Sequence, residues 1–75
     1  KFDDIWDFRE GLARVELNGK YGFIDKNGEF AIKPKFDDIW DFREGLARVE
    51  LNGKYGFIDK SGEFVIEPIF DDIYY

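Results

Sequence analysis

The chain has 75 residues, a formal net charge of −6, and aromatic side chains at 20% of its positions. It has no cysteine or histidine, which excludes disulfides and the thiolate or imidazole ligands of structural zinc sites. Nucleic acids and anionic membranes attract clustered Lys and Arg, so the negative charge argues against both as partners. We expect a soluble protein of undefined compartment, because no apolar run approaches a membrane span and the first residues do not resemble a signal peptide.

The whole chain is built from one repeated sequence. Residues 1–34 recur almost unchanged as residues 35–68, and residues 69–75 begin a third copy. A fixed period of this length is typical of repeat arrays, in which a unit cannot bury its apolar face until a neighbour covers it. We therefore predict a single repeat domain over residues 1–75, with two complete repeats and a partial third repeat or cap.

The two complete copies differ only at Ser61, Val65 and Glu67. Natural repeats usually diverge, because each copy has its own environment and the end copies serve as caps. The residue alphabet is also narrow, without Thr or Gln and with a single Ser. Both observations favour an engineered or consensus-built sequence, that is, a designed or de novo protein, over a recent tandem duplication.

Turn signals divide each copy into strands. Asn18-Gly19 lies between two alternating apolar runs, the pattern of a β-hairpin with a type I′ turn. Asp25-Lys26-Asn27-Gly28 is typical of a type I turn whose glycine takes a left-handed conformation. Pro34 and its counterpart Pro68 are expected to end the third strand, because proline cannot donate a ladder hydrogen bond. The unit is thus a three-stranded antiparallel β-meander, and the fold class is all-β.

The two turns also predict how the strands pair. The first turn predicts the pairs Ala13–Ile24, Arg14–Phe23, Val15–Gly22 and Glu16–Tyr21, and the second predicts Ile24–Phe30, Phe23–Ala31 and Gly22–Ile32. One sheet face then carries Ala13, Val15, Ile24, Phe30 and Ile32, and the other carries Leu12, Tyr21 and Phe23 beside Arg14 and Glu16. Because the second face is half apolar, we expect the next copy to cover it in part, so that successive copies pack face against face.

Two features of each copy are less regular. Gly22 and Gly56 lie in mid-strand, where glycine weakens a sheet unless another group approaches closely; we expect that group to be an aromatic ring, Trp6 or Trp40. The segment Phe2–Gly11 fits a short fourth strand followed by a turn, an irregular crossover, or one helical turn with apolar residues spaced by three. We favour the short strand.

The small number of copies limits how the chain can hide its apolar faces. Free-standing arrays usually need about three repeats, and a domain of this size buries only about 60% of its unfolded surface. We therefore expect either closure of the two copies into a small barrel or association of chains, as a homo-oligomer or a strand-exchanged dimer. An open solenoid and a closed form are equally compatible with the sequence. Residues 69–75 are expected to cap an exposed edge.

The run EGLARVELNGKYGFIDKNGEFAI resembles the WG β-repeat, also called the KWG repeat. The resemblance extends over the whole chain, and the shared positions include Gly11-Leu12-Ala13, Val15, Asn18-Gly19-Lys20, Gly22, Ile24-Asp25, Gly28, Ile32 and Pro34. In one departure, the tryptophan of the family's Trp-Gly pair is tyrosine, at Tyr21 and Tyr55, and the tryptophans lie at Trp6 and Trp40. The resemblance implies a β-repeat with a scaffold or binding role and supplies no catalytic residues.

Candidate chemical sites are few. Carboxylates that could bind Ca²⁺ cluster at Asp3, Asp4, Asp7, Asp37, Asp38, Asp41, Asp71 and Asp72. Their spacing does not match an EF-hand loop, so turn capping is the stronger interpretation. A carboxylate pair for glycoside hydrolysis is disfavoured, because both copies carry the same acids and such a pair needs two distinct roles. Ser61 occupies a turn without a histidine to activate it. We expect no catalytic residue, no cofactor and no metal.

Exposed aromatic side chains can mark recognition sites. The candidates for binding or packing are Trp6, Trp40, Tyr21, Tyr55, Tyr74 and Tyr75. They could form a stacking surface for a glycan or a protein partner, but filling the seam between copies is the stronger interpretation. The sequence therefore favours a structural, self-assembling β-repeat scaffold without enzymatic activity. The alternative is a binding module for a protein or a cell-wall glycan that uses the aromatic and acidic surface.

Overall fold

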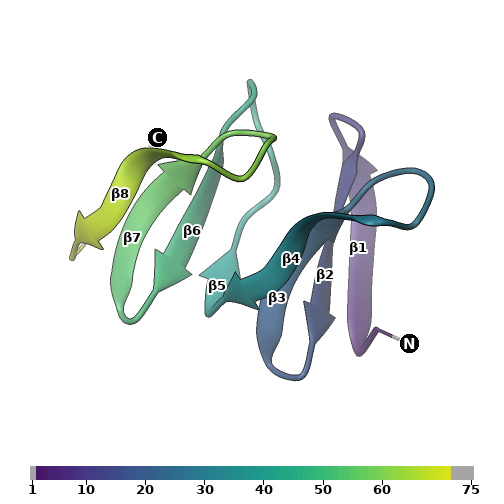
Figure 1. Ribbon diagram of the computed structural model, residues 1–75, viewed down its shortest axis with the longest axis horizontal. Coiled ribbons are helices and arrows are strands. Elements are labelled where there is room, and N and C mark those ends of the chain that lie inside the picture. Colours follow the sequence, from purple (N-terminus) through teal and green to yellow (C-terminus); the bar gives the residue numbers. More distant parts are fainter. Residues whose placement is uncertain (1, 72–75) are drawn as a thin grey trace.

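The structure, a computed structural model, describes residues 2–71. Its strands are β1 (Asp4–Arg9), β2 (Leu12–Leu17), β3 (Lys20–Ile24), β4 (Phe30–Phe36), β5 (Asp38–Ile39), β6 (Ala47–Leu51), β7 (Lys54–Ile58) and β8 (Phe64–Phe70). Strands β1 to β4 form one antiparallel sheet, sheet 1, and β5 to β8 form a second, sheet 2 (Figure 1). Within this range, no helix has the length and apolar character that a membrane span requires. The all-β repeat architecture is confirmed, and the sheets stay open rather than closing into a barrel.

The hairpin between β2 and β3 has the predicted register. Ala13 pairs with Ile24 and Val15 with Gly22, and the corresponding pairs recur between β6 and β7. Asn18 has a φ of 56°, the left-handed conformation that a type I′ turn requires. Turn chemistry and alternation of apolar residues therefore agree in this part of the sheet, and the prediction is confirmed.

The pairing of β3 with β4 departs from the prediction. Ile24 pairs with Phe30 as expected, but Phe23 pairs with Ile32, because the register shifts between the two pairs. The predicted pairs Phe23–Ala31 and Gly22–Ile32 are therefore wrong. Ala31 is the extra residue, and a single inserted residue reverses the alternation of the rest of the strand. Ile32 consequently lies on the same face as Phe23 and packs in the same core.

Strand β4 continues through Pro34, where we expected it to end, and reaches Phe36. Proline is tolerated there because β4 is an edge strand and is irregular where it passes Gly22. A Cβ atom on Gly22 would lie 2.4 Å from the carbonyl oxygen of Ile32. The group that approaches this glycine is thus the backbone of β4 and not the ring of Trp6. The same two corrections apply to the second copy.

The segment that begins each copy forms a strand, as we favoured. In sheet 1 it is β1, which pairs with β2 through a turn at Glu10-Gly11. Its counterpart β5 covers only Asp38–Ile39, and an isolated bridge between Arg43 and Leu46 precedes β6. The second copy therefore repeats the meander with a shorter first strand.

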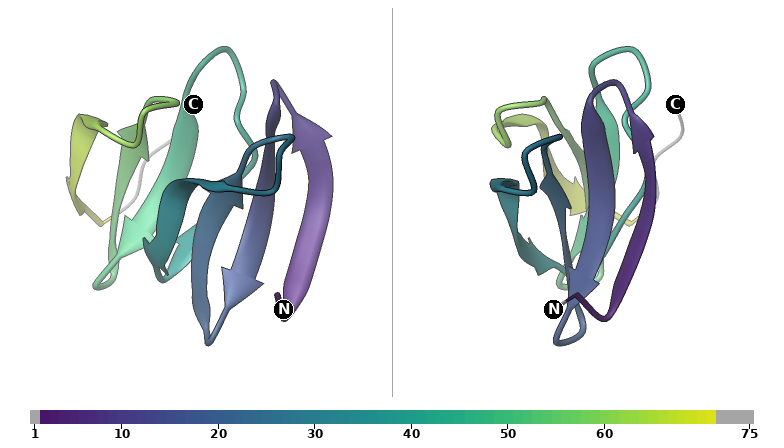
Figure 2. Two further views of the ribbon diagram at one scale, coloured as in Figure 1. Left: turned by 45° about the vertical axis from the view of Figure 1, so that its right-hand side comes forward. Right: turned by 90° about the vertical axis from the view of Figure 1, so that its right-hand side faces the viewer.

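The two sheets lie against each other as successive layers (Figure 2). One core joins them, and its buried members are Leu12, Phe23, Ile32, Phe36, Ile39, Phe42, Ala47, Val49 and Ile58. A smaller core of Ala13, Val15 and Ile24 lies on the opposite face of sheet 1, with Phe2 packed against it. The prediction that successive copies pack face against face is confirmed.

Candidate functional site

The seam, by which we mean the interface between sheet 1 and sheet 2, joins two unlike faces. Sheet 1 contributes Leu12, Phe23 and Ile32, and the second copy contributes Ile39 and Phe42. The ring centroids of Phe23 and Phe42 are 4.7 Å apart at an interplanar angle of 56°, a tilted arrangement that stabilises aromatic pairs beyond their buried area. In the first copy, the counterparts of Ile39 and Phe42 lie on the outer side of the molecule and are exposed. The copies therefore stack head to tail.

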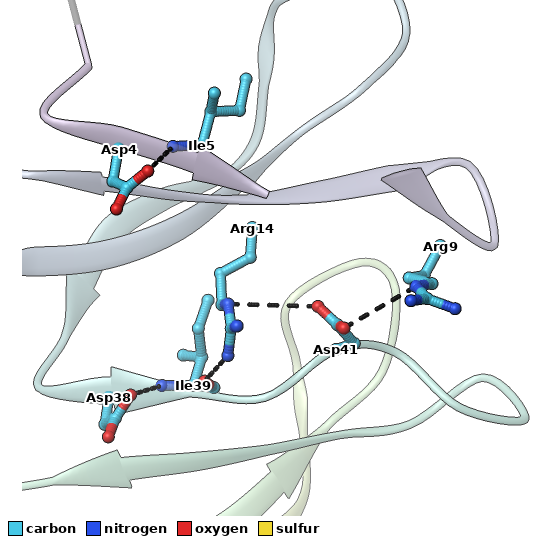
Figure 3. Close-up of polar contacts among 7 residues, drawn as sticks. All are labelled: Asp4, Ile5, Arg9, Arg14, Asp38, Ile39 and Asp41. Carbon is cyan, nitrogen blue, oxygen red and sulfur yellow. Dashed lines mark hydrogen bonds and ion pairs between the residues drawn. The ribbon is translucent and has the colours of Figure 1, made fainter. Parts of the chain in front are cut away.

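Arg14 connects the two sheets at the seam (Figure 3). Its Nη1 atom donates a 2.7 Å hydrogen bond to the carbonyl oxygen of Ile39, and its Nε atom lies 4.0 Å from Oδ1 of Asp41. The other oxygen of Asp41 lies 3.8 Å from Nε of Arg9. The guanidinium also stacks on the ring of Trp6, 4.4 Å from its centroid. A charged donor fixed by an aromatic ring is well placed for a strong, directional bond.

A turn of sheet 1 also contacts the corresponding turn of the second copy. The carboxylate of Glu10 accepts hydrogen bonds from the N–H groups of Glu44, at 2.6 Å, and Gly45, at 2.9 Å. The ammonium of Lys60 lies 3.4 Å from the same carboxylate. The Gly45 N–H is the main cause of a lowered pKa of Glu10, and Glu44 and Lys60 reinforce it against the opposing effect of burial. This contact fixes the alignment of the copies.

Asp37 lies where the chain passes from sheet 1 to sheet 2. Its carboxylate accepts hydrogen bonds from Nζ of Lys20, at 2.5 Å, and from the N–H of Asn52, at 2.7 Å. Lys20, followed by the Asn52 N–H, lowers the pKa of Asp37. Lys54 binds Asp71 in the same way. One carboxylate thus ties a strand of sheet 1 to a turn of sheet 2.

Each sheet carries a cluster of one Trp, one Arg and one Tyr, which we call the Trp–Arg–Tyr trio. In sheet 1 the three residues lie on β1, β2 and β3. In sheet 2 the tryptophan directly follows β5, and the other two residues lie on β6 and β7. In sheet 1, the ring centroids of Trp6 and Tyr21 are 6.0 Å apart, and Arg14 lies over the tryptophan. Burial, with a smaller effect of Glu16, raises the pKa of Tyr21. The second trio consists of Trp40, Arg48 and Tyr55. All six side chains are half-buried, so both trios present partly accessible aromatic surface.

The other residues singled out from the sequence have structural positions. Asp3 accepts a backbone N–H of the β2–β3 turn, which confirms turn capping for this aspartate. The hydroxyl of Ser61 donates to Asp59 within its turn. Across residues 2–71, the structure places no three Asp or Glu side chains together in a group that could hold a metal ion. Tyr74 and Tyr75 lie outside the described residues.

The roles of Arg14 and Glu10 in joining the sheets were not predicted from the sequence. For Arg14 a signal existed, because the predicted register places it on the half-apolar face that the next copy was expected to cover. For Glu10 there was none, because a turn glutamate is ordinarily solvated and its partners lie 34 and 35 residues further along the chain.

Two nearly identical β-meanders that stack through unlike faces define a tandem β-repeat protein. Comparison with known protein families matches the WG containing repeat over three adjacent segments, residues 1–21, 21–55 and 55–75. The chain belongs to this family, which confirms the resemblance. The segments meet at Tyr21 and Tyr55, the positions at which tyrosine replaces the tryptophan of the Trp-Gly pair. Searches of curated proteins and of solved structures found no match.

Proposed function

We propose that this chain is a structural β-repeat scaffold, a module whose work is to stack sheets into a rigid array. The seam is the observation that carries this proposal, because the larger of the two cores lies between the copies and not within one of them. A sheet of this kind leaves large apolar side chains exposed on a face that no other sheet covers, as Ile5 and Phe8 show on the outer face of sheet 1. The near-identity of the copies supports an engineered or consensus origin for the scaffold.

The polar groups support a structural role in preference to a catalytic one. Glu10, Arg14 and Asp37 each connect one copy to the next. Among residues 2–71, the carboxyl groups with altered pKa values all shift downward, namely Glu10, Asp37, Asp59 and Asp71. A general acid that works near neutral pH needs the opposite shift. These carboxylates therefore act as fixed hydrogen-bond acceptors.

Native-state amide hydrogen exchange tests the proposal. If the seam stabilises both sheets, the core amides of β2, β3, β6 and β7 will open together, with the free energy of global unfolding. Phe42→Ala removes a ring from the seam and should speed exchange in both sheets, whereas Phe8→Ala alters the equivalent exposed ring and should leave sheet 2 unchanged. Sheets that open independently in the unaltered protein would contradict a scaffold based on the seam.

The second candidate function is a binding module for a protein or a cell-wall glycan. The half-buried Trp–Arg–Tyr trios favour it, because an aromatic face beside a guanidinium offers both stacking and hydrogen bonds. Titration of the protein with a panel of glycans and peptides should then change the tryptophan emission, and Trp6→Phe and Trp40→Phe should show which trio responds. Unchanged emission across the panel would remove this candidate.

A further inference from the structure

We propose that a second copy of this chain docks on the outer face of sheet 2, so that the seam is repeated between molecules. This inference rests on the proposed scaffold function and identifies the partner of the scaffold as a second molecule of the same chain. The C-face is the outer face of sheet 2, and its exposed apolar residues include Ile66 and Phe70. The N-face is the outer face of sheet 1, and its exposed apolar residues are Ile5, Phe8 and Phe30. In the proposed stack, the C-face of one molecule contacts the N-face of the next molecule.

Exposure shows that each outer face is one half of a seam. Ile66 on the C-face is 36% exposed, whereas its counterpart Ile32, covered by sheet 2, is 4% exposed. Phe8 on the N-face is 40% exposed, whereas its counterpart Phe42, covered by sheet 1, is 3% exposed. Residue type and position in the repeat are the same within each pair, and one member of each pair is covered by the other sheet. A partner of the same shape would bury both outer faces.

The two outer faces match each other because the seam already contains both of them. In the seam, the turn between β7 and β8 packs on sheet 1, and a Cβ atom on Gly62 would lie 3.2 Å from Cγ1 of Ile32. Gly28 is the counterpart of Gly62, and Ile66 is the counterpart of Ile32. In the proposed stack, Gly28 of the docking molecule therefore packs on Ile66 of the first molecule.

The polar contacts of the seam also have counterparts on the outer faces. Arg48 has the position that Arg14 has in sheet 1, and it stacks on its tryptophan in the same way, with its guanidinium 4.1 Å from the centroid of the Trp40 ring. The C-face therefore carries the same ring-stacked guanidinium as the face of sheet 1 that sheet 2 covers.

The stack is open-ended because it joins unlike faces. Each added copy leaves one C-face and one N-face uncovered, and such head-to-tail contacts produce chains of copies unless the rotation closes a ring. A contact between two like faces would instead end at a dimer. The stoichiometry of association thus distinguishes the proposed mode from any symmetric pairing.

Residues 69–75 of one molecule correspond in the repeat to residues 1–7 of the docking molecule, so the two segments compete for the same positions of the stack. Phe2 packs on Phe30 within its own chain, with ring centroids 5.7 Å apart, and Phe70 of the neighbouring copy has the equivalent place in the repeat. In the stack Phe70 takes this place and displaces Phe2; the aspartate that follows each phenylalanine is anchored, Asp71 by Lys54 and Asp3 by the Asn18 N–H. Phe2→Ala should then strengthen association and Phe70→Ala should weaken it. The reverse order would overturn this exchange of residues.

Sedimentation velocity over a wide range of protein concentration tests the proposal. The mass of the unaltered chain should rise with concentration beyond that of a dimer. Phe8→Asp blocks the N-face and Ile66→Asp blocks the C-face, so each variant alone should stay monomeric, while an equimolar mixture should form a 1:1 dimer and nothing larger. Val65→Asp is the matched control, because Val65 is exposed and its counterpart Ala31 stays exposed beside the seam.

Three results would overturn the proposal. They are a monomeric unaltered chain at every concentration, a face variant that still dimerises alone, and a mixture of the two variants that stays monomeric. If Phe8→Asp fails to fold, Gly28→Asn replaces it as the N-face variant, because Asn tolerates the left-handed conformation and the site has open space within the chain; this variant should fold and lose association. A folded monomer with shared amide opening would leave the scaffold function standing while removing the docking.

Discussion

Ile5 and Ile39 have the same position in the two copies, yet Ile5 is 51% exposed and Ile39 is fully buried. Their neighbours in the sequence are also the same. The difference arises because sheet 1 covers Ile39, whose carbonyl oxygen is bound by Arg14. This pair of isoleucines therefore separates the contribution of the seam from that of residue type and local structure.

We predict that Ile39→Ala lowers the free energy of unfolding by about 2–5 kcal/mol, the usual cost of emptying a buried isoleucine site. Ile5→Ala should cost less than about 1 kcal/mol, because half of that side chain is already in water. Urea denaturation in dilute solution, followed by circular dichroism, measures both values. Equal losses for the two variants would mean that the seam contributes little to stability.

A pair of glycines offers a second comparison. Gly28 and Gly62 have φ values of 83° and 89°, so a side chain at either position costs about 1–2 kcal/mol of backbone strain. Only at Gly62 would the added Cβ also press on Ile32 across the seam. Gly62→Ala should therefore be more destabilising than Gly28→Ala by about 1 kcal/mol. Thermal melts at low protein concentration give the ordering, and a greater loss from Gly28→Ala would contradict the packing.

Arg14 provides a test of the polar part of the seam. Arg14→Gln removes the hydrogen bond to the Ile39 carbonyl and the attraction to Asp41, and should cost about 1.5–3 kcal/mol, the range for hydrogen bonds to charged groups. Arg14→Lys keeps the charge but loses the planar fork, so it should recover part of the loss. Chemical denaturation of the three proteins gives these values. Full stability of Arg14→Gln would show that the guanidinium is dispensable.

Acid should weaken the contact at Glu10. Its pKa in the folded protein lies below the ordinary value of 4.5, so the folded state holds the ionised carboxylate more strongly than the unfolded chain does. The resulting stabilisation is complete above the unfolded value and is lost as the pH falls through the folded pKa. Asp37 and Asp71 shift in the same direction, from 3.8. The melting temperature should therefore fall as the pH decreases below about 5.

The variant Glu10→Gln isolates the part of this acid effect that belongs to one residue. It should melt below the unaltered protein at neutral pH and show a shallower loss on acidification. Glu29→Gln removes an equal charge from an exposed turn residue and serves as the control. Identical pH profiles for Glu10→Gln and the unaltered protein would exclude a role for the Glu10 carboxylate.

The hairpin of β2 and β3 could be predicted residue by residue, because an Asn-Gly turn and a two-residue alternation specify the same register. The partner of Ile32 could not, because alternation assumes a regular strand and Ala31 is an extra residue in β4. The register shift moves the side chains of the residues that follow it to the opposite face of the sheet. Close approach to Gly22 was predicted correctly, but the approaching group is backbone, which carries no signature in the sequence.

The seam itself was expected from the half-apolar face, but its polar contacts were not. Glu10 binds N–H groups of the next copy, and such a bond depends on the relative placement of two turns, which no local pattern encodes. Prediction of the Arg14 contact would likewise have required the position of the Ile39 carbonyl group. The repeat period indicates that copies pack together, whereas the offset between copies emerges only from the three-dimensional arrangement.

Each sheet consists of four consecutive strands, so its backbone ladders are completed within one period of the sequence, residues 4–36 for sheet 1 and residues 38–70 for sheet 2. In a gene for such a protein, duplication or deletion of one whole period would change the length of the array and leave every strand pairing intact. A duplication or deletion of any other length would leave part of a meander without its neighbouring strands. The architecture thus tolerates recombination in whole repeats. The number of repeats can change while the fold of each repeat stays the same.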